Sequence, residues 1–135
     1  MPLDLEIVSP ERLLLSRPVD MVVIPAAEGE MGVLPLHAPM IVLLQGGVIR
    51  LYDKNQVTEQ LFVSGGFAEV TQTRVTVLAD EATPITQVSR AAAEQRLTAA
   101  EADYAAADRS DVPALDVAMG RIQAARAMMQ AAGAP

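Results

Sequence analysis

Glu28, Glu30 and His37 are the residues of this chain whose types and spacing could carry out chemistry. Two carboxylates and an imidazole this close in sequence could ligate a divalent ion or act as an acid–base pair. The segment predicts a loop, however, and a loop gives the three side chains no fixed register. We therefore expect Glu28 and Glu30 to be solvated loop acids and His37 to be a surface or turn histidine, with no bound metal.

Other catalytic signatures are missing from the sequence. It has no cysteine, which excludes thiolate catalysis and thiolate zinc sites, and a single histidine, which excludes a histidine-rich metal cluster. Its one lysine, Lys54, belongs to no phosphate-binding loop. Ser64 is no nucleophile elbow, because Phe62 stands where that pattern needs glycine. We expect a protein that is not an enzyme and that holds no cofactor.

Two glycine pairs and three methionines allow more than one interpretation. Gly46–Gly47 and Gly65–Gly66 could line a ligand, but glycine pairs more often provide positive φ at turns and bulges, which we favour. Met119, Met128 and Met129 either fill gaps in the packing or form an adaptable partner surface.

Composition limits what the chain can bind. The net charge of −7 and the pI of about 4.5 argue against a nucleic-acid partner. With 51% hydrophobic and 3% aromatic residues, the core must consist of Val, Leu, Ile and Ala. The start carries acids where a signal peptide needs basic residues. Residues 31–49 are uncharged and could be mistaken for a membrane-spanning helix, but Pro35 and Pro39 would break a helix. This stretch therefore predicts strand and loop. We expect a soluble, cytoplasmic protein.

Residues 1–86 have the pattern of a β-domain. They hold seven of the nine prolines and six of the eight glycines, between short alternating apolar runs. The alternation at residues 3–7 is typical of a half-buried strand. Residues 48–63 and 66–78 each predict a hairpin. Together these runs predict a β-sandwich of about eight to ten strands.

Residues 87–135 change character. They contain seventeen alanines in forty-nine residues, and apolar residues recur at helical spacing over 97–107 and 115–129. The polar break between these runs offers Ser110 or Asp111 as a helix cap and Pro113 for the first turn. We expect an α+β protein, in which the sandwich is followed by a C-terminal antiparallel two-helix hairpin. The hairpin should be the less stable part, docked on the sandwich or on a partner.

Two stretches of the sandwich segment carry a family resemblance. Residues 28–40, followed by 47–50, resemble the signature of the epsilon subunit of F-type ATP synthases, which is called delta in mitochondria. Residues 63–70 and 74–82 resemble its second signature, and the opening residues 5–11 also fit. The resemblance covers the first 86 residues almost continuously and is weaker in the helical tail. The family's fold, a sandwich followed by a helical hairpin, coincides with the division that the periodicity predicts.

The resemblance implies a non-catalytic rotor subunit that passes torque between proton flow and the catalytic sites. In this family the sandwich docks on the gamma subunit and stands on the polar loops of the membrane c-ring, at the cytoplasmic face of the bacterial inner membrane. The c-ring contact maps onto Glu30 and His37, and a gamma contact maps onto Ser9. Where the family commonly has glycine before the histidine, this chain has Leu36, which alters the loop or adds an apolar contact. Contact with the membrane would be indirect, through the complex.

The hairpin is the regulatory part of the family. In many members it blocks ATP hydrolysis by placing basic residues against acidic segments of the alpha and beta catalytic subunits. From residue 112 onward this chain offers only Arg121 and Arg126 against Asp116, which predicts weak inhibition. Of the family's nucleotide-binding motif only Arg90 and Ala91 remain, so we expect weak nucleotide binding or none, and we assign no nucleotide-binding residue.

Two other functions are alternatives at this stage. A free-standing ligand-binding β-sandwich using the Glu28–His37 loop would be a monomer indifferent to gamma. A metal-dependent enzyme would lose its activity on chelation. A rotor subunit should instead carry a contiguous apolar patch on the sandwich that gamma covers.

Overall fold

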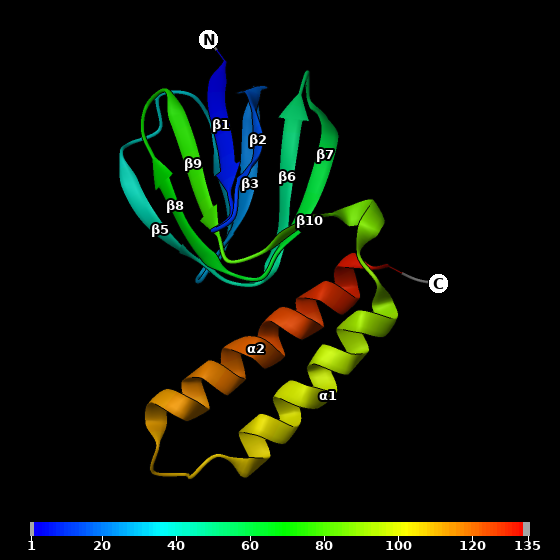
Figure 1. Ribbon diagram of the computed structural model, residues 1–135. Coiled ribbons are helices and arrows are strands. Elements are labelled where there is room, and N and C mark those ends of the chain that lie inside the picture. The colour runs from blue at the N-terminus through cyan, green and yellow to red at the C-terminus, as the bar shows by residue number, and fades with distance from the viewer. Residues whose placement is uncertain (1, 134–135) are drawn as a thin grey trace.

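The computed structural model describes residues 2–133, and ten strands form the first part of that range (Figure 1). The strands are β1 Leu3–Val8, β2 Leu13–Val19, β3 Met21–Ala26, β4 Gly29–Val33, β5 Met40–Leu44, β6 Gly47–Asp53, β7 Gln56–Val63, β8 Gly66–Val70, β9 Arg74–Ala79 and β10 Ala82–Pro84. Their order is β10-β7-β6-β3-β5-β8-β9-β1-β2, and β4 pairs with β3 off this path. The predicted β-sandwich is confirmed. Met1 and residues 134–135, the end of the predicted hairpin segment, lie outside the described residues.

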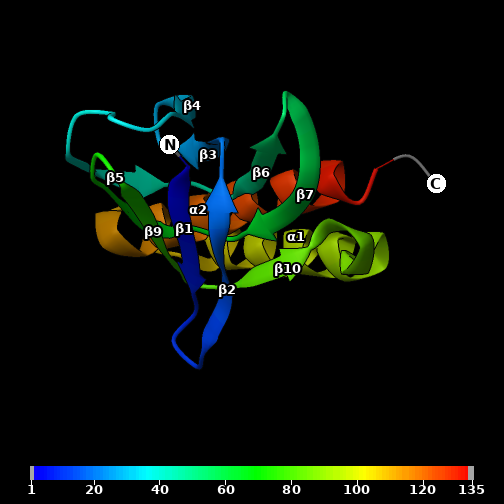
Figure 2. The ribbon, with the colours of Figure 1, turned by 90° about the horizontal axis from the view of Figure 1, so that it is seen from above.

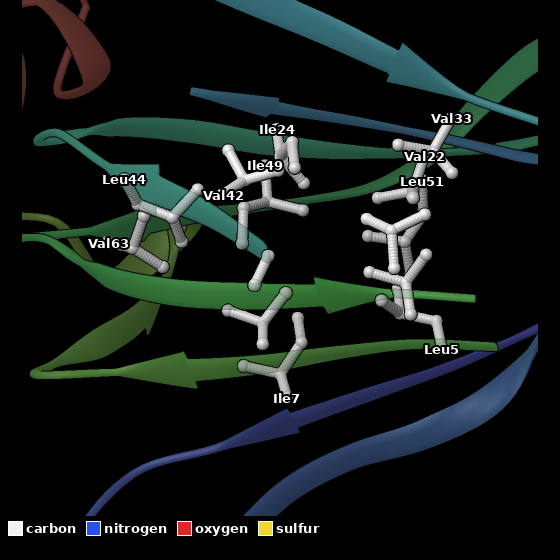
Figure 3. Close-up of a cluster of buried hydrophobic side chains, with 14 of the residues drawn as sticks. Leu5, Ile7, Val22, Ile24, Val33, Val42, Leu44, Ile49, Leu51 and Val63 are labelled. Carbon is white, nitrogen blue, oxygen red and sulfur yellow. The ribbon is translucent and has the colours of Figure 1, made fainter. Parts of the chain in front are cut away.

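The core of the sandwich follows from the alternation of apolar residues along the strands. Leu3, Leu5 and Ile7 on β1 are fully buried, while the acids between them face outward. Val22 and Ile24 on β3 repeat the pattern, and Figure 3 shows such side chains filling the space between the strands. The cluster consists of Leu, Ile, Val and Ala, as the composition predicts.

The backbone conformation of two turns explains which residue types occupy them. Lys54 and Asn55 have φ of 52° and 63° and join β6 to β7 in the two-residue turn that a right-twisted hairpin favours. Gly65 and Gly66, with φ of 144° and 130°, take the positive φ that we expect of this pair.

The same prediction is wrong for Gly46–Gly47, which does not take positive φ within the described chain. Close approach explains this pair instead. A Cβ on Gly46 would lie 2.5 Å from the Ala124 Cα, and one on Gly47 would lie 2.6 Å from the Pro25 Cβ. Gly46 therefore marks the place where a helix backbone meets the sandwich.

The C-terminal segment folds into the expected antiparallel helical hairpin. A short 3-10 turn, η1 (Ile85–Gln87), leads into α1 (Arg90–Ala106), and α2 (Val112–Ala131) follows after a short break. The Ser89 side chain accepts a hydrogen bond from the Ala92 backbone and caps α1, and Asp111 does the same for α2 through Ala114. Pro113 stands in the first turn of α2, as predicted.

The hairpin docks against one end of the sandwich. Figure 1 shows α2 between the sandwich and α1, and Figure 2, which looks down on the sandwich, shows the hairpin crossing beneath it. Phe62 of β7, Ala93 of α1 and Met128 of α2 form a small buried cluster at this junction. Met128 thus fills a gap in the packing, whereas Met119 is exposed.

The uncharged stretch 31–49 consists of strands and their connections, as predicted. Among the helices of residues 2–133, none has the length and apolar character needed to span a bilayer.

Candidate functional site

An apolar row crosses five neighbouring strands on the outer face of the sandwich. It consists of Leu43 on β5, Phe67 on β8, Leu78 on β9, Val8 on β1 and Leu13 on β2. Each is paired with the next in the strand register, from Leu43 with Phe67 to Val8 with Leu13. Directly paired residues point to the same face of a sheet, so their side chains form one continuous surface.

The apolar row is open to solvent. Leu13, Leu43, Phe67 and Leu78 are each between 52% and 56% exposed, and Ile41 beside them on β5 is 73% exposed. Soluble monomers rarely leave a contiguous apolar surface uncovered unless it is an interaction site. The contiguous apolar patch expected of a rotor subunit is therefore present, on strands that the sequence alone could not name.

Ser9, the predicted gamma contact, lies at the end of the apolar row. It follows Val8 directly and begins the turn between β1 and β2. Its backbone N–H donates to the Arg12 carbonyl at 2.9 Å, and its hydroxyl donates to the same oxygen at 3.3 Å. The turn thus holds Ser9 beside Val8 and Leu13.

Glu30 lies on β4 and not in a loop, so the prediction of a loop acid is wrong for this residue. The strand β4 begins at Gly29, directly after the turn that carries the exposed Glu28. Glu30 is therefore the second residue of β4, and it lies opposite Pro25 of β3 in the strand register. The exposed Glu30 carboxylate is 2.7 Å from the Arg50 guanidinium of β6. Glu30 therefore presents a paired carboxylate on the outside of β4.

His37 lies in the loop between β4 and β5, which confirms the turn histidine. Its Nδ1 is 2.8 Å from the Ala38 carbonyl, and its backbone N–H donates to Leu34 at 3.2 Å. His37 shares no hydrogen bond with Glu30, and residues 2–133 bring no three His, Cys, Asp or Glu side chains together as a metal site. The structure thus places Glu30 and His37 on one strand–loop segment, with no hydrogen bond or ion pair between them among the described contacts of residues 2–133.

Arg121 and Arg126 lie on α2, and Arg121 is engaged within the hairpin. Its guanidinium is 3.8 Å from the Asp103 carboxylate of α1. Both side chains are at least 60% exposed, so this pair contributes little stability. Arg126 is exposed on α2. The sequence-based prediction for Arg121 considered only charges within the last helix, and Asp103 lies on α1.

Two polar contacts, which we call the hairpin latch, hold the helices to the sandwich. The Gln123 side chain of α2 pairs with both backbone groups of Gly46: the Gly46 N–H donates to Oε1 at 2.8 Å, and Nε2 donates to the Gly46 carbonyl at 2.7 Å. The Arg96 guanidinium of α1 donates to both carboxylate oxygens of Glu81 at 2.6 and 2.9 Å. Such a two-pronged ion pair fixes orientation as well as distance. No sequence motif points to either contact.

Acid should weaken the Glu81–Arg96 part of the hairpin latch. Hydrogen bonds from Arg96 lower the pKa of the Glu81 carboxyl below its ordinary 4.5. A carboxyl whose folded pKa is depressed stabilises the fold above its unfolded pKa, and this stabilisation is lost as the pH falls through the folded value. Both side chains are more than a third exposed, so the contribution stays below about 1 kcal/mol.

Melting curves at pH 7 and pH 3 test this expectation. Glu81→Gln should melt a few degrees below the wild type at pH 7, and the difference should shrink at pH 3. Glu101→Gln, a substitution of an exposed acid on the same helix as Arg96, is the control and should change neither value. A difference that persists at pH 3 would show that the Glu81 carboxylate charge is not what holds the hairpin.

A cavity of about 980 Å³ lies between the sandwich and the hairpin. Gly46, Gly65 and Gly66 line it, together with Leu43 and Phe67 of the apolar row. Glu28, Glu30 and His37 do not line it, so this cavity gives no support to a ligand site in that segment.

Comparison with known proteins identifies the family. Residues 2–85 match the family model described as ATP synthase, Delta/Epsilon chain, beta-sandwich domain. The chain is 68% identical over 128 residues to the ATP synthase epsilon chain of Granulibacter bethesdensis, covering 95% of each protein. It is 50% identical over 135 residues to that of Gluconacetobacter diazotrophicus, covering 100% of this chain and 96% of the relative.

Solved structures show the same fold at low sequence identity. A chain of the Euglena gracilis mitochondrial ATP synthase (OSCP/F1/c-ring) superposes with a TM-score of 0.77 at 23% identity, covering 96% of this chain and 81% of that one. A chain of the Tetrahymena thermophila mitochondrial ATP synthase central stalk and c-ring gives 0.67 at 10% identity, covering 98% and 97%.

A sandwich that leaves a continuous apolar row exposed and carries a docked helical hairpin has the surface of an interaction module. The chain belongs to the delta/epsilon chain family of ATP synthase. It is therefore an accessory, rotor-stalk subunit of the F-type ATP synthase complex and not one of its catalytic subunits.

Proposed function

We propose that the sandwich, residues 1–86, binds the gamma subunit through the apolar row and so couples the c-ring to gamma during ATP synthesis. The observation that carries this proposal is the continuity of the row, in which four of the five residues are more than half exposed. A rotor must transmit torque without slipping, and a continuous apolar surface on a rigid sheet supplies a wide area of contact. Ser9 lies at the rim of this contact.

The strand–loop segment that carries Glu30 and His37 contacts the polar loops of the c-ring. Glu30 is held by Arg50 on a rigid strand, and His37 is fixed by contacts within its loop. This geometry suits a static footing better than catalysis. A subunit with this footing works at the cytoplasmic face of the bacterial inner membrane and reaches the bilayer only through the complex.

The hairpin, residues 87–135, inhibits ATP hydrolysis weakly. When it is docked, the hairpin latch ties both helices to the sandwich and Asp103 engages Arg121. Only Arg121 and Arg126 could meet acidic segments of the alpha and beta subunits from α2. Exposed ion pairs contribute about 0.5 kcal/mol each, so two arginines together add about 1 kcal/mol and an undocked hairpin binds the catalytic subunits weakly.

Adding the chain back to an ATP synthase that lacks it tests the proposed function. Saturating full-length protein should restore proton-driven ATP synthesis in membrane vesicles. It should suppress ATP hydrolysis less than about fivefold, the factor that corresponds to about 1 kcal/mol of added contact.

Three results are informative in this experiment. Restored synthesis with little inhibition supports a coupling subunit. Strong inhibition that Arg121→Ala and Arg126→Ala together abolish would assign inhibition to the hairpin and contradict its weak role. Failure to bind gamma would refute the rotor contact itself and favour a free-standing sandwich.

A further inference from the structure

Leu36 has a backbone conformation that leucine rarely adopts. Its φ is 70°, in the left-handed region. The His37 N–H donates to the Leu34 carbonyl, which closes a four-residue turn with Pro35 in its second position and Leu36 in its third. A turn with proline second and positive φ third is of type II, and its third position favours glycine or asparagine. Leu36 therefore occupies a position where a bulky side chain strains the backbone.

Within residues 2–133, no side-chain contact of Leu36 compensates for this strain. The Leu36 side chain is 65% exposed, so it buries little surface against the sandwich. What holds the residue is its backbone N–H, which donates to the Gln72 carbonyl at 2.7 Å and would do the same with another side chain. Lys54 and Asn55, which also have positive φ, belong to a hairpin turn that requires it. Backbone strain that no contact within the fold offsets indicates that the residue serves a contact with another molecule.

Leu36 is the most exposed member of an apolar tip. Leu34 and Met40 are also exposed, by 56% and 41%, at the two ends of the same loop. No charged residue occurs between Met31 and Ile49, although the protein as a whole has a net charge of −7. The tip therefore offers a partner an apolar surface that carries no charged side chain.

We infer that Leu36 is an apolar anchor for the c-ring, inserted in the hollow between neighbouring loop tips of the ring. This inference rests on the proposed function, because His37, the next residue, belongs to the proposed c-ring contact. A ring of identical subunits repeats the same hollow around its circumference, and a protruding leucine can fill one of them. The strained turn holds the side chain outward before the partner arrives, so little conformational freedom is lost on binding.

Two variants separate the side chain from the backbone strain. Leu36→Gly relaxes the turn and removes the apolar group, and Leu36→Asn removes the apolar group with a residue that tolerates positive φ. Asn55→Gly is the matched control, because it relaxes a positive-φ position and leaves the apolar tip intact. Each full-length variant is combined with the alpha, beta and gamma subunits, and binding to membrane vesicles that contain the c-ring is measured.

Both Leu36 variants should bind these vesicles roughly tenfold more weakly, the loss that one buried leucine accounts for. Their melting temperatures should equal or exceed that of the wild type, because the turn then carries a residue that suits it. Their affinity for gamma in the absence of membranes should not change. The Asn55→Gly control should bind vesicles like the wild type.

Other outcomes would overturn the inference. Unchanged vesicle binding by both variants, with a wild type that binds, refutes the anchor alone. A parallel loss of gamma affinity would assign Leu36 to gamma, and equal binding of the wild type to vesicles without the c-ring would assign the apolar tip to lipid. A wild type that binds neither gamma nor c-ring vesicles would instead refute the proposed function.

Discussion

Phe67→Glu should lower the affinity of the protein for gamma by roughly a hundredfold. Phe67 lies in the apolar row between Leu43 and Leu78, which are its partners on the two neighbouring strands. A large aromatic side chain at the centre of an interface commonly dominates binding. The substitution removes this apolar area and adds a carboxylate that binding would have to strip of water.

The fold itself should tolerate Phe67→Glu. Phe67 is 53% exposed and points away from the core that Ala68 and Val70 enter from the same strand. We therefore expect a melting temperature within a few degrees of the wild type, together with failure to assemble on gamma in a titration. Assembly can be followed by calorimetry or by co-elution with purified gamma.

Val57→Glu is the matched control for this prediction. Val57 is an exposed apolar residue on β7, outside the apolar row, and is 42% exposed. It should bind gamma like the wild type, although it carries the same new charge. If Val57→Glu weakened binding as much as Phe67→Glu, general charge and not the apolar row would explain the effect. Wild-type affinity in Phe67→Glu would place gamma on another face.

The apolar row illustrates what sequence periodicity can and cannot predict. Alternation shows that Phe67 and Leu78 face away from the residues that build the core, because successive side chains on a strand point to opposite faces. It does not show that Leu43, Phe67, Leu78 and Val8 are neighbours. The pairing of β1 with β9 joins segments about seventy residues apart, and no local pattern encodes it. Single exposed apolar residues therefore become a surface only when the strand order is known.

The helical hairpin was predictable in outline for a different reason. Helix caps and breaks are local, so Asp111 and Pro113 mark the start of α2 correctly. The docking contacts are not local, since Gln123 reaches the Gly46 backbone across 77 positions. A glutamine on a helix surface has no distinguishing pattern, and Gly46 resembles a turn glycine until a helix is placed against it. Likewise, the loop assignment of Glu30 was wrong because the pairing of β4 with β3 decides it.

Gly46→Val should detach the hairpin from the sandwich. A Cβ at this position would lie 2.5 Å from the Ala124 Cα and 2.9 Å from its Cβ, and a helix backbone cannot yield as a flexible side chain can. Overpacking of this kind typically costs about 1–3 kcal/mol. The displacement would also break both hydrogen bonds between Gly46 and Gln123. Because the hairpin otherwise docks through a small buried cluster and the exposed Glu81–Arg96 ion pair, this loss is large relative to what holds it.

Hydrogen exchange of the backbone amides measures this detachment. Amides of α2 should exchange at least roughly tenfold faster in Gly46→Val, while those of β1 and β9 in the sandwich core keep their protection. Gly120→Ala is the control on the same helix, because a Cβ there meets nothing within 4 Å. It should slow exchange in α2, since alanine favours a helix over glycine by about 1 kcal/mol.

The same variant separates docking from inhibition. A detached hairpin releases α2 from the sandwich and lets it carry the exposed Arg121 and Arg126 to other subunits. If the two arginines bind the alpha and beta subunits only weakly, ATP hydrolysis by the assembled complex changes little in Gly46→Val, even though hydrogen exchange shows that the hairpin is detached. A strong fall in ATP hydrolysis would mean that docking on the sandwich, and not the small number of basic residues on α2, keeps the wild-type hairpin from inhibiting. Unchanged exchange in α2 would contradict the close approach of Gly46 to Ala124 on which the prediction depends.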